Sequence, residues 1–226
     1  MEAQEPPFDP YRPPEAEVLP PQAPEGALEA LPWEDEVRHP AFWARLGAMF
    51  TLAFSSPASL GDRVQAGSGL LRPWTFVLAL SAPILLLMVL IFGAMGAFFG
   101  ILFKEGPKDL PAWIFPLVAL ALLVVMPLLS FVQMLIWGLL NHACLWMWGG
   151  LRQGAGLEHT IRLTGYTLAF FTLGSMIPLV NYVVFLAVPV VGGLAQARLH
   201  RTEPWRGVCA ALTPVALCCL SYVGWI

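Results

Sequence analysis

Long apolar runs separated by short polar breaks dominate the chain after about residue 70. The clearest run covers residues 160–197, where Arg162 is the only charged residue. A helix that crosses a bilayer needs about 20 mostly apolar residues, so this run is long enough for two such helices. Pro178 interrupts the run and Asn181 follows, and both residue types favour a break or a turn. The pattern predicts a membrane helical hairpin that turns between Pro178 and Asn181.

Three more apolar segments complete the predicted membrane domain, residues 73–226. The run at 110–151 contains no charge and predicts either one long helix that protrudes from the membrane or a hairpin that turns near 127–130. We therefore expect an all-α polytopic membrane protein with five transmembrane helices. The predicted spans cover about 74–103, 111–150, 160–178, 180–198 and 205–226.

Residues 41–72 have a different pattern and form a lead-in to the first span. Apolar residues recur at helical spacing, but the run is too short to cross a bilayer. We expect an amphipathic helix that lies in the membrane interface and ends near 55–57, followed by a second short helix at about 59–66. The predicted interfacial residues are Phe42, Trp43, Leu46, Met49 and Phe50.

Charge is segregated along the chain, which is 58% hydrophobic and only 12% charged. Residues 1–40 hold ten acidic residues and ten prolines against two arginines, whereas the remainder carries a net positive charge. A segment this polar cannot bury enough apolar surface to offset its ordering entropy, so we predict a disordered acidic, proline-rich tail. The first residues lack the features of a signal peptide, so the first internal span is expected to direct membrane insertion. Nothing predicts nucleic-acid binding, which requires a clustered basic face.

The distribution of arginine and lysine predicts the orientation, because these residues favour the cytoplasmic side. Five spans with a cytoplasmic N-terminus place only Lys104 and Lys108 outside, together with the C-terminus. The arginines then expected on the cytoplasmic side are Arg63, Arg72, Arg152, Arg162, Arg198, Arg201 and Arg206. The excess of arginine over lysine indicates a bacterial source, so the predicted location is the inner membrane.

Several short elements between residues 41 and 226 carry a resemblance to a known family. They are the lead-in at 42–57, Leu139-x-x-His142 followed by Gly149-Gly150, the sequence Thr164-Gly165-Tyr166-Thr167, and Ile177-Pro178. With the spacing of the spans, this pattern resembles the Yip domain family (Ypt/Rab-interacting proteins), five-span membrane proteins with a cytoplasmic N-terminus. Eukaryotic members bind Rab-type GTPases in traffic between endoplasmic reticulum and Golgi. Their Asp-Leu-Tyr-Gly-Pro element is replaced here by Leu71-Arg72-Pro73-Trp74, so the resemblance implies the fold more than that partner.

No catalytic or metal-binding pattern accompanies these spans. The chain lacks H-E-x-x-H, G-x-S-x-G and phosphate-loop motifs, and no acidic residue lies deep in a predicted span, so we expect neither an enzyme nor a cofactor. The polar residues of interest are Asn141, His142 and Tyr166. They either bond across helices, at a modest net gain, or line a small polar cavity. We further expect Gly165 to allow close helix packing, Tyr166 to bond across the bundle and Pro178 to set the turn.

Two functions from different classes fit these observations. The favoured one is a non-enzymatic membrane protein that organises the bilayer or recruits a cytoplasmic protein through its tail. The alternative is a small transporter or lipid-handling protein with a polar intramembrane cavity. Besides the lipid bilayer, a second copy of this chain, in a homo-oligomer, is a candidate partner. Gly96-x-x-x-Gly100 has the spacing of a close-packing helix face, which packs either against another helix of the same chain or against a second copy.

Overall fold

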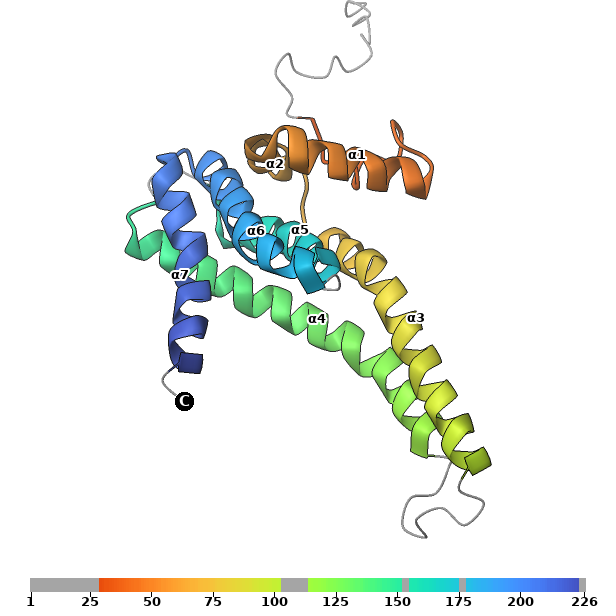
Figure 1. The fold of residues 1–226 in the computed structure, drawn as a ribbon. Helices are drawn as coiled ribbons and strands as arrows, with labels where there is room; N and C mark the ends of the chain where they lie inside the picture. The colour runs from red at the N-terminus through yellow and green to blue at the C-terminus, as the bar shows by residue number, and fades with distance from the viewer. Residues whose placement is uncertain (1–28, 103–113, 152–154, 175–177, 224–226) are drawn as a thin grey trace, which may run out of the picture.

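The computed structural model describes residues 29–102, 114–151, 155–174 and 178–223 (Figure 1). Within these residues the chain forms seven α-helices and no strand, so the predicted all-α class is confirmed. The helices are α1 (Phe42–Ser55), α2 (Pro57–Val64), α3 (Leu71–Leu102), α4 (Ile114–Met147), α5 (Leu157–Gly174), α6 (Pro178–Leu199) and α7 (Pro204–Val223).

Three helices are long and apolar enough to cross a membrane, fewer than the five predicted. The apolar stretches are Leu71–Phe98 in α3, Leu117–Met147 in α4 and Val180–Leu199 in α6. The protein itself buries only 17%, 11% and 28% of their most apolar windows, so lipid must cover most of this surface. Helix α7 contributes a shorter apolar stretch, Pro204–Leu220, whereas α5 is diluted by threonines and Arg162. The chain is a membrane protein with at least three candidate spans among the described residues.

Helix α4 settles how the long uncharged run is organised. It is one helix of 34 residues that passes through Pro127, rather than a hairpin. The indole Nε1 of Trp74 in α3 donates to the Pro127 carbonyl at 3.2 Å and to the Ser130 hydroxyl at 3.3 Å. Membrane helices tolerate proline when neighbouring groups satisfy the disturbed backbone. Helix α3 therefore supports α4 at its proline.

The predicted turn between Pro178 and Asn181 is placed wrongly. Helix α5 ends at Gly174 and α6 begins at Pro178, so Asn181 lies in the first turn of α6. Residues 175–177 fall outside the described part. Proline suits the first position of a helix, where its missing N–H costs nothing. Pro178 thus starts the second helix of the pair.

The lead-in forms the two predicted helices, which meet at Ser56, but its apolar stripe packs against protein. Met49 is fully buried, and Leu46 and Phe50 are partly buried in a core shared with α3, α5 and α6. Phe42 and Trp43 remain exposed, Trp43 at 76%. Figure 1 shows α1 and α2 lying across one end of the bundle. The stripe therefore caps the helix bundle, and Trp43 and Phe42 are the residues left to face the surroundings.

The helix termini alternate in direction and gather at this same end, which we call the lead-in end. Gln65, after α2, donates to the Leu199 carbonyl at the close of α6, at 3.1 Å. Arg162, near the start of α5, donates to the Gly69 carbonyl just before α3. Arg206, at the start of α7, donates to the Gly149 carbonyl after α4, at 2.9 Å. The starts of α5 and α7 and the ends of α4 and α6 thus lie together, whereas α3 begins beside the middle of α4, where Trp74 contacts Pro127 and Ser130.

Residues 29–40 correct the prediction that the whole tail to residue 40 is disordered. Leu31 is fully buried, Trp33 is 5% exposed, and the Trp33 ring packs edge-on against Phe76 of α3 with centroids 5.0 Å apart. Leu31 and Trp33 supply the apolar surface that the rest of the tail lacks, and their burial offsets the cost of ordering this segment. Residues 1–28 lie outside the described part.

Candidate functional site

The N-terminal segment is fixed to the bundle by a buried ion pair, which we call the Glu34 anchor (Glu34, Gly69, Arg162 and Tyr166). The Arg162 side chain in α5 is fully buried and pairs through Nη2 with the Glu34 carboxylate, which is 9% exposed. The Tyr166 hydroxyl, one turn further along α5, donates to Glu34 Oε1 at 2.6 Å. Arg162 Nη1 donates to the Gly69 carbonyl at 2.5 Å. A buried charge requires such partners, so the anchor fixes residue 34 against a helix 128 positions away.

Neighbouring groups leave the anchor little freedom to move. A Cβ atom on Gly67 would lie 2.0 Å from both Arg162 Nη2 and Glu34 Oε2, so only glycine fits without displacing the pair. The Trp33 indole donates to the Thr75 hydroxyl at 3.2 Å, and the Arg45 guanidinium lies over the Trp33 ring, 5.3 Å from its centroid. These contacts link the segment to α1 and α3 as well as α5.

The structure distributes the predicted polar residues over separate sites. Tyr166 belongs to the Glu34 anchor. A Cβ on Gly165 would lie 2.6 Å from Met134 Sδ and 2.9 Å from Pro73 Cβ, so α5 packs closely against α3 and α4 there. Asn141 faces a pocket, and the adjacent His142 does not line it.

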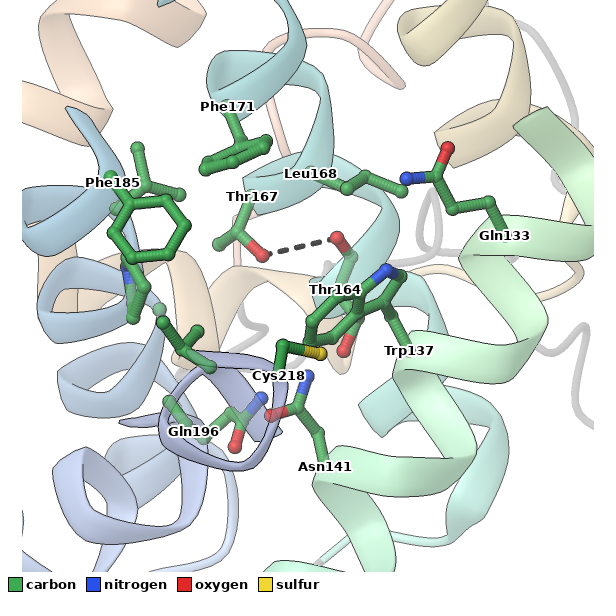
Figure 2. A pocket seen from close by; sticks show the side chains of 15 residues that line it. Gln133, Trp137, Asn141, Thr164, Thr167, Leu168, Phe171, Phe185, Gln196 and Cys218 are labelled. Carbon is green, nitrogen blue, oxygen red and sulfur yellow. Dashed lines mark hydrogen bonds between the residues drawn. The ribbon is translucent and has the colours of Figure 1, made fainter. Parts of the chain in front are cut away.

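The pocket lies between α4, α5, α6 and α7 and has a volume of about 160 Å³ (Figure 2). Its polar lining comprises Gln133, Asn141, Thr164, Thr167 and Gln196, with the indole N–H of Trp137 and the thiol of Cys218, and the other lining residues are apolar. Asn141 is 8% exposed and Gln196 is 2% exposed, yet Asn141 Oδ1 and Gln196 Oε1 have no hydrogen-bond partner. Buried amide oxygens are normally paired, so these two are exceptions among the described residues.

His142 instead belongs to a polar network at the lead-in end. Its Nδ1 lies 3.0 Å from the Thr160 hydroxyl, which lies 2.9 Å from Nε2 of His200. His200 follows α6 and is fully buried, and its Nδ1 has no partner. Burial, together with the nearby His142 and His159, lowers the pKa of His200 to about 4. His200 is therefore neutral near pH 7, and the network holds the end of α6 to the start of α5.

Reasoning from the sequence missed Glu34 and His200, and it gave Arg162 no partner. Arg162 carried a usable signal, since a lone charge in an apolar run needs a partner. Nothing in a single sequence identifies that partner. Within the described residues, no group of three or more His, Cys, Asp or Glu side chains could hold a metal ion.

No family model, no curated protein and no solved structure matches this chain.

Proposed function

We propose that this chain is a non-enzymatic membrane protein of the Yip type, which holds an acidic, proline-rich N-terminal segment at the cytoplasmic face and recruits a protein partner there. The observation that carries the proposal is the Glu34 anchor. It fixes the base of that segment to the bundle through a fully buried arginine. A tether that only needed to be long and solvated would not require such a contact.

Five crossings are part of the proposal, with α5 and α7 as the two shorter spans. Support comes from the directions of the helices. The starts of α5 and α7 lie beside the ends of α4 and α6, and the contacts at Gly165, Gly174 and Gly193 pair each helix from α4 onward with the next one in the opposite direction. Six of the seven arginines predicted to be cytoplasmic belong to described residues near this end, at 63, 72, 162, 198, 201 and 206. Contacts with α3, α4 and α6 cover α5, which compensates for its lower hydropathy.

The chemistry of the segment defines the partner. Residues 1–28 contain eight prolines and six acidic residues against Arg12 alone. Proline-rich chains favour the extended polyproline II conformation and dock in aromatic-lined grooves. The acidic side chains favour a groove with a basic rim. The expected partner is a cytoplasmic protein with both features.

Two reporter fusions at Ile226 test the topology. One reporter is active only outside the membrane and the other fluoresces only in the cytoplasm. An external signal from the full chain supports five spans with a cytoplasmic N-terminus. A cytoplasmic signal contradicts the five-span proposal and the resemblance to the Yip family with it.

Removal of residues 1–28 tests recruitment, because it leaves the Glu34 anchor intact. We expect wild-type membrane abundance and thermal stability together with the phenotype of the complete gene deletion. The matched control replaces the six acidic residues of 1–28 by glutamine and serine while keeping the prolines, which separates charge from backbone conformation. A strain that behaves as wild type without residues 1–28 would refute recruitment through this segment.

A further inference from the structure

We infer that two arginines beside the start of α3, Arg45 and Arg72, form a site for the phosphate group of an anionic membrane lipid, which the Glu36 carboxylate occupies in the structure. Arg45 Nη1 lies 3.2 Å from Glu36 Oε1, and Arg72 Nη1 pairs with the same oxygen. The two guanidinium groups come from α1 and α3, and α1 lies across the first turns of α3 (Figure 1). The three side chains together carry one net positive charge, so the single carboxylate does not neutralise both guanidinium groups.

The Glu36 carboxylate is held weakly enough to be exchanged for another anion. Its side chain is 54% exposed and that of Arg72 is 47% exposed. Ion pairs that solvent reaches contribute little to stability, because water and salt screen them. Glu34, two residues earlier, holds the N-terminal segment through a pair in which the Arg162 side chain is fully buried. The segment therefore stays docked when Glu36 leaves the two arginines.

The electrostatics of the site favour an anion with the geometry of phosphate. Arg72 and, to a lesser degree, Arg45 lower the pKa of Glu36 from its ordinary value, so both guanidinium groups favour negative charge at this point. Arginine forms paired hydrogen bonds with phosphate, and a tetrahedral phosphate presents its oxygens in several directions. Each guanidinium then has a phosphate oxygen of its own, whereas both now share Oε1 of Glu36. The positive end of the α3 dipole, at Leu71, adds to the attraction.

The position of the two arginines along the chain indicates that the phosphate belongs to a lipid. The apolar stretch of α3 starts at Leu71, which is 63% exposed, so lipid covers the residue next to Arg72. Phe42 and Trp43, whose ring centroids are 5.0 Å apart, are exposed at the start of the helix that carries Arg45. Exposed aromatic and basic side chains at the end of a spanning helix are typical of the headgroup level, where basic pockets bind anionic heads. The acyl chains of such a lipid follow the exposed apolar face of α3.

The test titrates the purified full chain in detergent with phosphatidylglycerol and counts the bound lipids by native mass spectrometry. We expect one lipid to bind before the others, and phosphatidylcholine, whose phosphate is neutralised by its own ammonium group, to bind about tenfold more weakly. Glu36→Gln should tighten the first binding event about fivefold, because it removes the competing carboxylate. Arg45→Gln/Arg72→Gln should weaken it about tenfold. The matched control Arg198→Gln breaks an exposed pair with Asp62 and should bind as wild type.

If Glu36→Gln binds phosphatidylglycerol no more tightly than the wild type, the inference is overturned, as it is by equal affinity for phosphatidylcholine. Thermal unfolding of each variant is measured alongside. If the double variant does not fold, Arg72→Gln alone provides the second test, and unchanged binding by that folded variant would reject the site. Excess inorganic phosphate should leave the lipid bound, and its displacement would reject the lipid as the source of the phosphate. The chain without residues 1–28 should bind as the wild type, which separates this site from recruitment by the tail.

Discussion

Replacing Glu34 by glutamine is the most direct perturbation of the anchor. The substitution keeps the shape of the side chain but leaves the Arg162 guanidinium buried without a counter-charge. Removal of one partner from a buried pair costs about 3–5 kcal/mol. Glu34 is 9% exposed, so we take the lower value, about 3 kcal/mol, which shifts the docking equilibrium of the segment about 150-fold toward release.

Hydrogen exchange measures this shift directly, because two amides of the segment are held by local hydrogen bonds. The N–H groups of Glu34 and Asp35 donate to the Leu31 carbonyl at 2.8 and 3.0 Å. We expect their exchange in Glu34→Gln to accelerate by up to about 150-fold while exchange within α4 stays unchanged.

Two variants provide the controls. Arg38→Gln removes an exposed ion pair, in which the Arg38 side chain is 62% exposed, and should change exchange by less than about fivefold. Arg162→Met combined with Glu34→Gln removes both charges and should cost less than the sum of the single changes. Acceleration below fivefold in Glu34→Gln would refute the anchor as the contact that holds the segment.

Three further predictions concern packing, pH and the pocket. A Cβ on Gly207 would lie 2.1 Å from the Gly193 carbonyl oxygen, so Gly207→Ala should force α6 and α7 apart and destabilise the protein by about 1–3 kcal/mol in thermal unfolding. In contrast, Gly47→Ala, with nothing within 4 Å of the new Cβ, should stabilise α1 by about 1 kcal/mol; the reverse order would contradict the packing. The pKa of His200 in the folded protein is about 4, below its ordinary 6.5, so between these pH values the unfolded chain binds one proton more than the folded chain. The free energy of unfolding should therefore fall by about 3 kcal/mol as the pH drops from 6.5 to 4, and the contribution of His200 should then level off. The same titration of His200→Gln should lack this loss. Asn141→Leu should raise the melting temperature of lipid-free protein, since it removes an unpaired buried oxygen, and a lowered value would indicate a partner for that oxygen within the protein.

Local sequence patterns were sufficient to predict the positions of several helices. Ser55-Ser56-Pro57 marks the junction between α1 and α2, and the spacing of apolar residues identifies α3, α4 and α6. Proline positions were harder to interpret. Pro127 lies within a continuous helix supported by Trp74, whereas Pro178 begins one, and the difference depends on the neighbours of each residue.

The sites depend on pairs of residues that are distant in sequence, so they could not be predicted. The partner of Arg162 is Glu34, and the pocket joins Asn141 of α4 to Gln196 of α6. For residues 29–40 composition led to the wrong prediction of disorder. The prolines and acidic residues of this segment outnumber its two large apolar residues that pack against the bundle, Leu31 and Trp33. Asn141 lines a mostly apolar pocket, whereas its neighbour His142 belongs to another network.

The length of the α3–α4 hairpin has a mechanical consequence for the bilayer. The apolar stretch of α4 has 31 residues, about 46 Å at 1.5 Å per residue, and that of α3 has 28, about 42 Å. A hydrocarbon core is about 30 Å thick, so α4 fits only with a tilt of about 50°, steeper than helices commonly adopt, or with local thickening of the lipid. Figure 1 shows α3 running beside the first part of α4, and α4 continuing past the start of α3 toward α5 and α7. Hydrophobic mismatch of this size costs less in a thicker bilayer, so we expect the protein to favour thick bilayer regions.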